Sequence, residues 1–398
     1  MWKNDFNPFD KLNKVTFIPV LFQVYNTYRY NERDIGFWTK DAIFSYPYAL
    51  INAYHHKNDM RKNTPEKLLP NSVIFADSGG LQSIILGDKK QTDIVELTKW
   101  QERHSNIGFC FDVIPFKTDT RKLTGWEFDE KNFVSCAQKT LENITTALSV
   151  RTNNNFKLYG IIQGRKYKEY KVWYDIISNS KVDGFCMKSS TNNPMNVAES
   201  LLFAYHHFDK PLHLLGMSNL TKTIVIYYFS QYYKNKITFD SSSYNIGNRF
   251  HTYIHPSAPS VKIRYVKDEV EKDDDLMIFE KIYNLSFCGC TACSLVTHTE
   301  FSKWHMENDP RLGPLITLHN FLTLQRMFVF LEQICHSKSA LIQLVKALFT
   351  EGMTRRVLAA FDFIDEGVEK GFDRVSEKYK SLLIEDTSIQ KQSSIFSF

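Results

Sequence analysis

Six polar side chains stand at or just after the ends of short apolar runs, and two of them are carboxylates suited to displacement chemistry. Asp77 opens the motif Asp77-Ser78-Gly79-Gly80 directly after one run, and Asp240 follows another. Displacing a base from a sugar needs one carboxylate as nucleophile and a second group that moves protons. The other polar residues at such ends are Asp112, Gln163, Lys188 and Ser218.

A purine base offers donors and acceptors along its edge, which Asp112, Gln163 and the backbone near Gly79 and Gly80 can satisfy. Paired glycines let backbone N–H groups approach a planar ligand closely. Each motif alone also has a plainer interpretation: Asp-Ser-Gly-Gly and Gln163-Gly164 are turn sequences, and Asp112 and Asp240 suit helix caps. It is the set as a whole that favours a base pocket.

A metal site is indicated by three of the seven cysteines, Cys288, Cys290 and Cys293, which crowd into six positions. Thiolates are good Zn²⁺ ligands, whereas isolated buried cysteines behave as small apolar residues. The candidates for a fourth ligand are His298, His305 and His319. Three thiolates and one histidine leave no open coordination position, so we expect a structural Zn²⁺ rather than a catalytic one.

The elements that must position these residues are eight short β-branched or aromatic runs with helical stretches between them. The runs cover residues 15–21, 44–51, 72–76, 107–111, 156–162, 182–187, 212–216 and 237–239. Alternating strands and helices fit a parallel barrel or an open doubly wound sheet. The polar residues fall at the carboxyl ends of the runs, which converge on one mouth in a (β/α)₈ barrel, so we predict an α/β fold of the TIM-barrel type.

We expect the chain to divide into a catalytic barrel followed by a smaller zinc-binding subdomain. The predicted units are a (β/α)₈ barrel over 1–275, a zinc-binding subdomain with closing helices over 276–370, and a C-terminal tail over 371–398. The charged, aperiodic stretch 261–275 predicts a surface insertion or linker. Helical spacing over 317–335, 339–351 and 354–370 predicts the closing helices.

Composition sets broad limits on function. The chain has 398 residues, 43% of them hydrophobic and 23% charged, as in soluble globular proteins. A net charge of +5 is compatible with a polyanionic partner without indicating one. We expect no signal peptide and no membrane span, and the odd cysteine count favours a reducing, cytoplasmic compartment.

Taken in order, these motifs resemble those of the tRNA-guanine transglycosylase family, over residues of about 15–335. The matching stretches are Asp77-Ser78-Gly79-Gly80, Phe111-Asp112, Gly160-Ile161-Ile162-Gln163-Gly164, Leu215-Gly216, Phe239-Asp240 and Cys288-x-Cys290-x2-Cys293-x25-His319-Asn320. The zinc signature is the most specific of them. The resemblance implies a (β/α)₈ barrel with a zinc subdomain that exchanges guanine for a 7-deazaguanine without breaking the polynucleotide backbone.

The resemblance also implies roles for individual residues. Asp240 would attack C1′ and hold a covalent glycosyl intermediate, and Asp77 would act as general acid and base. The base edge would be read by Ser78, Gly79, Gly80, Asp112 and Gln163. Zn²⁺ would be held by Cys288, Cys290, Cys293 and His319.

The sequence departs from the tRNA enzymes in the walls of the pocket. Leu81 replaces an aromatic residue, Leu215 replaces a methionine, and a Gly-Gly floor is missing near Lys188. The segment after the nucleophile, which includes Arg249, also differs. This pattern is similar to the DNA-modifying branch of the family in bacteria and their phages, which inserts bases such as preQ0.

We therefore expect a DNA-guanine transglycosylase, acting alone, as a homodimer or with accessory proteins in a bacterial or phage-infected cell. A duplex base must be extruded before it reaches a barrel mouth. Leu81 and Leu215 would sandwich that base, and Lys188 or Arg249 would hold phosphates. One alternative is a divergent tRNA-guanine transglycosylase. Another is a non-catalytic accessory subunit, against which the retention of both Asp77 and Asp240 argues.

Overall fold

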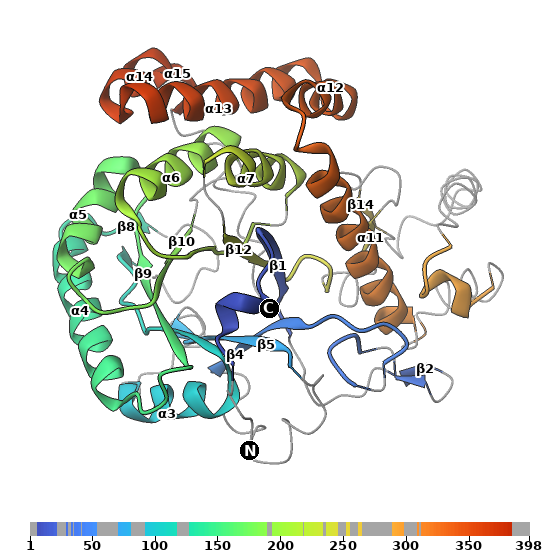
Figure 1. The fold of residues 1–398 in the computed structure, drawn as a ribbon, viewed down its shortest axis with the longest axis horizontal. Coiled ribbons are helices and arrows are strands. Elements are labelled where there is room, and N and C mark those ends of the chain that lie inside the picture. The colour runs from blue at the N-terminus through green and yellow to red at the C-terminus, as the bar shows by residue number, and fades with distance from the viewer. Residues whose placement is uncertain are drawn as a thin grey trace.

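A computed structural model gives the fold (Figure 1). It describes residues 6–21, 29–30, 33–34, 36–40, 42–53, 71–80, 92–117, 127–188, 193–217, 219–233, 236–245, 252–254, 262–264, 289–297, 309 and 312–383.

Eight parallel strands form one nearly closed barrel, in the order β1-β12-β11-β10-β9-β6-β5-β4. They are β1 (Val15–Pro19), β4 (Tyr48–Asn52), β5 (Val73–Asp77), β6 (Ile107–Phe109), β9 (Lys157–Ile162), β10 (Gly184–Met187), β11 (Leu212–Leu214) and β12 (Ile237–Ser241). A parallel bridge between Val20 and Leu50, with the Leu21 N–H donating to the Leu50 carbonyl at 2.8 Å, joins the two ends. The predicted (β/α)₈ barrel is confirmed.

Side chains alternate along each strand between the interior of the barrel and the surrounding helices. In β5, Val73 and Phe75 belong to the cluster that fills the barrel, while Ile74 and Ala76 face the surrounding helices. Both faces of a parallel barrel are buried, so the strands read as continuous apolar runs. A polar side chain at an inward position near a carboxyl end therefore opens onto the mouth of the barrel.

The amino end of the barrel is covered by the short helix η1 (Pro8–Lys11), dark blue in Figure 1. The Tyr48 hydroxyl donates to the Lys11 carbonyl at 2.6 Å, and Lys236 Nζ donates to the Phe9 carbonyl at 2.6 Å. Both contacts lie at the starts of strands. The opposite, carboxyl end is the one left for a site, as in other barrels of this type.

Helices surround the barrel (Figure 1). They are α3 (Ile94–His104), α4 (Phe133–Val150), α5 (Tyr167–Ile177), α6 (Pro194–His207), α7 (Leu220–Tyr232) and α11 (Leu312–Ile334). Asp93, Asn193 and Asn219 cap the first turns of α3, α6 and α7. Such caps satisfy N–H groups that lack partners inside the helix. The helix α11 covers β1 and β12, where Phe328 packs on Phe17 and Phe239.

The remaining elements lie outside the barrel. Three antiparallel hairpins pair β2 (Arg29–Tyr30) with β3 (Arg33–Asp34), β7 (Phe116–Lys117) with β8 (Glu127–Phe128), and β13 (Thr252–Ile254) with β14 (Lys262–Arg264). The other helices are η4 (Cys293–Leu295), α12 (Lys338–Leu348), α13 (Glu351–Lys370), α14 (Phe372–Lys378) and α15 (Lys380–Leu383). The segment expected to be a tail therefore begins with two helices.

The helix α13 lies along α6 and α7 and makes them internal to the fold (Figure 1). A methyl group at Gly367 would overlap Leu202 of α6, so glycine permits this close approach. Asp365 accepts hydrogen bonds from the hydroxyls of Tyr228 and Tyr233 at 2.6 and 2.7 Å. Consequently α6 and α7 are buried almost all round, as their low amphipathicity indicates.

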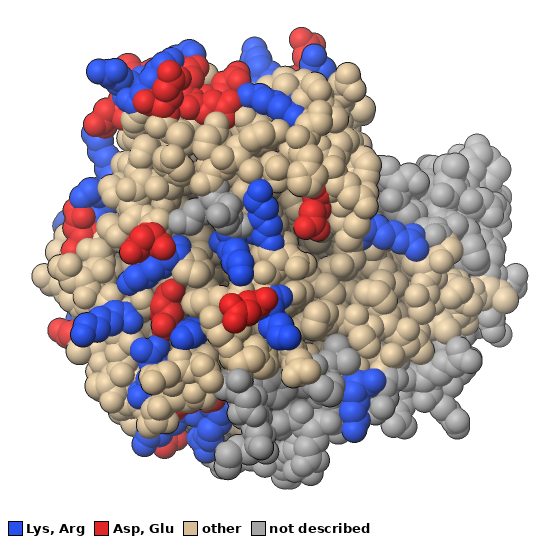
Figure 2. All heavy atoms as spheres, in the orientation of Figure 1, with Lys and Arg blue, Asp and Glu red and all other residues tan. Residues whose placement is uncertain are grey.

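Charges of both signs lie interspersed on the face shown in Figure 2, so that face does not by itself indicate where a polyanion binds. No helix in the described part of the chain has both the length and the apolar character that crossing a bilayer requires.

Candidate active site and metal centre

Three carboxylates meet at the carboxyl end of the barrel. Asp77 is the last residue of β5, Asp112 follows β6, and Asp240 is the second-last residue of β12. Their charges act on one another: those of Asp112 and Asp240 both raise the pKa of Asp77. The structure thus brings together the three acidic residues that the sequence singled out.

Asp240 is held by one of its two carboxylate oxygens. Oδ1 accepts the Gly216 N–H at 2.9 Å and a hydrogen bond from His213 Nε2 at 3.2 Å. Gly216 adopts a φ of +70°, a conformation that glycine reaches without strain. The other oxygen, Oδ2, makes no hydrogen bond to any residue in the described ranges, which leaves it available to attack an electrophile.

Sequence reasoning missed His213, which is fully buried in β11. Because a carboxylate oxygen only accepts, Nε2 carries the proton toward Asp240, and Nδ1 contacts the Thr238 hydroxyl at 2.8 Å. The ring packs against Phe109 and Phe75, with centroid distances of 4.8 and 5.5 Å. The available signal was strand alternation, since Leu212 and Leu214 face the helices and leave His213 pointing inward beside β12.

We predict that His213→Phe lowers the rate of any displacement in which Asp240 is the nucleophile about 10- to 100-fold, because Asp240 loses one of two donors while the ring packing is kept. That range corresponds to about 1.5–3 kcal/mol for a hydrogen bond to a charged group. The reaction proposed below allows kcat and KM to be measured, and we expect KM to change little. Partial recovery in His213→Gln, whose amide can donate from a similar position, would distinguish positioning from packing; unchanged kcat in His213→Phe would contradict this role.

Asp77 is poised to exchange protons near neutrality. Burial, followed by the charge of Asp112, raises the pKa of Asp77 to about 7, although backbone N–H groups of Gly79 and Ser78 oppose the shift. Asn52 Nδ2 donates to Asp77 Oδ2 at 2.6 Å from the neighbouring position of β4. Asn52 was also missed, because the predicted strand ended one residue before it. A carboxyl group with this pKa can act as both acid and base at neutral pH.

Asp112 and Gln163 form the second polar pair at the mouth. Gln163 Nε2 donates to Asp112 Oδ2 at 2.6 Å, and Asp112 is buried, which raises its pKa. Gly80 lies against them, since a Cβ there would stand 3.5 Å from Asp112 Oδ1. The buried Ser78 hydroxyl has no hydrogen-bond partner in the described structure, so it is a donor available to a ligand.

Two further predicted residues border this mouth. Leu215 is half-buried and packs against the barrel interior, and its N–H donates to the Met187 carbonyl at 2.8 Å. Lys188 is exposed, yet surrounding protein lowers the pKa of its amine, while the charges of Asp240 and Asp112 act to raise it. Leu81, Ser218 and Arg249 lie outside the described residues, so their roles stay predictions.

Cys290, Cys293 and His319 form a separate buried cluster, with their ligand atoms within 4.8 Å of one another. Nδ1 of His319 lies 3.5 Å from Cys290 Sγ and 3.3 Å from Cys293 Sγ. Tetrahedral Zn²⁺ with ordinary Zn–S and Zn–N bonds places such atoms about 3.5 Å apart. The geometry therefore fits a metal ion. Cys288, His298 and His305 lie outside the described residues.

The backbone around this cluster fixes the histidine and ties the centre to the barrel. His319 Nε2 contacts the Ile254 carbonyl at 2.9 Å, which turns Nδ1 toward the thiols. The next residue, Asn320, accepts the Ile254 N–H at 2.7 Å and donates to the Tyr244 carbonyl at 3.2 Å. Tyr244 follows Asp240 by four residues. Asn320 thus links the Cys/His cluster to the chain segment that follows Asp240.

We predict that Cys290→Ser lowers bound zinc at least tenfold and lowers the melting temperature, because a structural ion binds the folded chain and stabilises it. Elemental analysis and thermal unfolding measure both effects. Cys335→Ser is the matched control, since Cys335 is also buried but directly follows α11 and is not part of the cluster. Full zinc content with unchanged melting in Cys290→Ser would contradict a metal role for this thiol.

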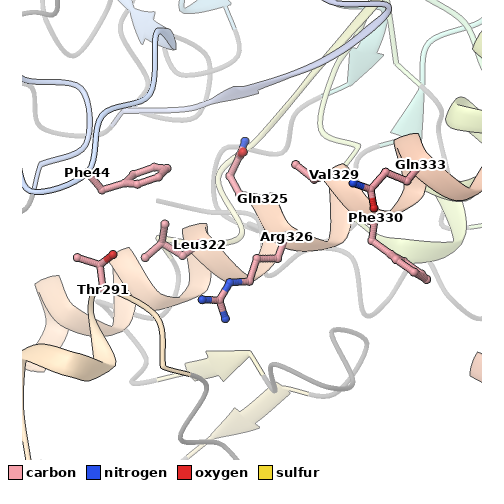
Figure 3. Close-up of a pocket in the computed structure, with 8 residues that line it drawn as sticks. All are labelled: Phe44, Thr291, Leu322, Gln325, Arg326, Val329, Phe330 and Gln333. Carbon is pink, nitrogen blue, oxygen red and sulfur yellow. The ribbon is translucent and has the colours of Figure 1, made fainter.

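A groove of about 400 Å³ on α11 is distinct from the carboxylate site (Figure 3). Figure 3 shows Phe44 facing Leu322 and Gln325 across it, with Val329 and Phe330 farther along the helix. Its lining contains no carboxylate and no pair of titratable groups, so it offers no acid–base chemistry.

Comparison with models of known protein families gives no match, and comparison with curated proteins gives none. Fold and site define the class on their own: an α/β barrel with acidic residues at its carboxyl mouth and a separate Cys/His cluster suited to a metal ion.

Proposed function

We propose that the protein is a base-exchange enzyme, a pentosyltransferase that replaces guanine in DNA with a 7-deazaguanine such as preQ0. The observation that carries the proposal is the pairing of two unlike carboxylates at one mouth. Asp240 is fixed through Oδ1 with Oδ2 available, and Asp77 has a pKa of about 7. Two carboxylates in different environments can divide the roles of nucleophile and proton carrier.

The exchange takes two displacements at C1′. In the first, Oδ2 of Asp240 bonds to C1′ as the bond from C1′ to the guanine nitrogen breaks, and protonated Asp77 gives its proton to the departing base. In the second, the incoming base loses its proton to Asp77, its nitrogen bonds to C1′, and Asp240 leaves as a carboxylate. Atoms, charge and protons balance, and the phosphodiester backbone is untouched.

The remaining polar groups suit recognition of the base. Asp112 accepts hydrogen bonds, Gln163 both donates and accepts, and the Ser78 hydroxyl is an unused donor. Leu215 offers an apolar surface for a base face. Such a set binds a purine edge, and the exchanged bases share most of that edge.

The metal centre has a supporting role in this proposal. Zn²⁺ would be held by Cys288, Cys290, Cys293 and His319 and would stabilise the fold without an open coordination position. Cys110, Cys136, Cys186 and Cys335, which lie outside the Cys/His cluster, are buried free thiols, and this suits the reducing cytoplasm of a bacterial or phage-infected cell.

Uptake of isotope-labelled preQ0 tests this function. The protein is incubated with labelled base and either guanine-containing duplex DNA or tRNA, and label in the polynucleotide is counted. We expect uptake into DNA, faster for a mismatched or single-stranded guanine because extrusion then costs less. Uptake mainly into tRNA would assign the protein to the tRNA enzymes, and no uptake into either would contradict base exchange.

A further inference from the structure

Lys222 is a buried lysine that neither the proposed chemistry nor the sequence analysis uses. It lies in the first turn of α7 and is only 6% exposed. Lysine is rarely buried to this extent without a partner, because the ammonium group loses hydration. Within the described chain, Lys222 makes no hydrogen bond or ion pair. An anionic ligand would supply the partner that the described chain does not.

A second positive charge, that of Lys188, acts on Lys222 and also favours binding of an anion there. Burial and then the positive charge of Lys188 lower the pKa of Lys222 to about 8, so the amine is mostly protonated at pH 7. Lys188 itself lies within reach of Asp240 and Asp112. The Lys222 amine therefore lies near the Lys188 amine, which in turn lies near the proposed nucleophile, and the carboxylates act on Lys188 alone.

The position of Lys222 in the fold is one where barrels bind phosphate. In barrel order β11 is the seventh strand, and α7 follows it directly. Phosphate groups commonly bind at the loops after the seventh and eighth strands, next to the N-terminus of a helix. Within the described part of this connection, Gly216 is exposed, and a Cβ there would meet nothing within 4 Å.

The same connection is bonded to the nucleophile. The Gly216 N–H donates to Asp240 Oδ1 at 2.9 Å, and the Met217 N–H donates to the Asp240 carbonyl at 2.8 Å. These hydrogen bonds would therefore hold an anion bound at the start of α7 at a fixed position relative to the Asp240 carboxylate. In a polynucleotide, the anions closest to C1′ outside the base are the two phosphates that flank the nucleotide.

We propose that Lys222, together with Lys188 and the first turn of α7, binds a backbone phosphate flanking the guanine that is exchanged. This inference rests on the proposed function and adds a specific contact with the polynucleotide. The contact would hold the extruded nucleotide so that C1′ faces Asp240, independently of which base the nucleotide carries.

The test is a double-mutant cycle that combines the Lys222→Met substitution in the protein with the replacement of one charged phosphate in the DNA by a neutral methylphosphonate. Lys222→Met removes the charge and keeps a long apolar side chain, and Lys346→Met, at an exposed lysine of α12, is the matched control. Affinity is measured by fluorescence anisotropy with a guanine-containing duplex and with copies bearing one methylphosphonate on either side of the target guanine.

We expect Lys222→Met to weaken binding about tenfold and to reduce the slope of log K against log salt by about one, whereas Lys346→Met changes neither. One methylphosphonate position should weaken wild-type binding by a similar factor and have no further effect in Lys222→Met. Additive losses at both positions, or unchanged affinity in Lys222→Met, would overturn the contact even if wild-type protein exchanges bases normally.

Two more measurements keep the outcome clear. If Lys222→Met does not fold, the wild-type protein alone decides, because the proposal requires one methylphosphonate position to matter more than every other along the duplex. Inorganic phosphate supplies the second measurement. If Lys222 is needed for binding phosphate in the millimolar range but not for binding DNA, the site takes a small anion and the backbone contact is overturned. Absence of exchange by wild-type protein, in contrast, would count against the proposed function itself.

Discussion

Replacing Asp240 with alanine is expected to lower the rate of base exchange by roughly 10⁴-fold or more, because no other group can form the covalent bond to C1′. Asp240→Asn is the sharper variant. Its amide oxygen can still accept from Gly216 and His213, so the local hydrogen bonds are kept while the nucleophilic carboxylate is lost. Single-turnover release of guanine from DNA measures the effect directly.

Both Asp240 variants should retain the fold and the metal, since Asp240 contacts neither Cys290 nor His319 in the described structure. Melting temperature and zinc content are the controls. A folded Asp240→Ala protein that exchanges bases at an appreciable fraction of the wild-type rate would remove Asp240 from the mechanism.

Replacing Asp77 with asparagine is expected to slow exchange about 10²- to 10⁴-fold, the usual contribution of general acid–base catalysis. The two half-reactions should respond to pH in opposite directions. Release of guanine needs protonated Asp77, so its rate falls as pH rises above the pKa of about 7. Entry of the new base needs the deprotonated form, so its rate falls as pH drops below that value. Full exchange should therefore be fastest near neutrality.

Measuring the half-reactions separately, by guanine release and by capture of labelled base, tests this assignment. Asp77→Asn should abolish both pH dependences. Asn52→Leu is an informative companion, because Asn52 donates to Asp77 at 2.6 Å and favours its anion. Its loss should move both profiles to higher pH. Wild-type half-reactions that share one pH profile would contradict a single carboxyl group in both roles.

The barrel strands could be located in the sequence because each is a short apolar run, and six of the eight runs have one of the polar residues singled out above at or just after their carboxyl ends. Each predicted run overlaps one observed strand, for example 237–239 against Ile237–Ser241 of β12. The grouping of Asp77, Asp112 and Asp240 followed from the same logic, since parallel strands end at one mouth. The strand positions and the grouping of the carboxylates could both be predicted because they depend only on the local pattern of apolar residues and on the parallel direction of the strands.

The residues missed by sequence reasoning depend on contacts between strands or on burial. His213 lies between two leucines in β11 and reads as an ordinary core position until β11 and β12 are aligned in register. A role for Asn52 can be recognised only once β4 and β5 are aligned and Asn52 is seen to lie beside Asp77. Lys222 reads as a solvated helix residue, and it is buried because α7 is enclosed by other helices. The spacing of apolar residues along the sequence does not show which strands or helices will lie next to one another, so it could not predict these contacts.

The most direct test of the central claim is to trap the glycosyl intermediate on Asp240. Wild-type protein is incubated with guanine-containing DNA in the absence of an incoming base, denatured, digested and analysed by mass spectrometry. We predict a covalent deoxyribosyl adduct on the peptide that contains Asp240, formed with stoichiometric release of guanine and absent from Asp240→Asn. An adduct on a different residue, or base exchange that proceeds with direct inversion at C1′ and no adduct, would contradict the account.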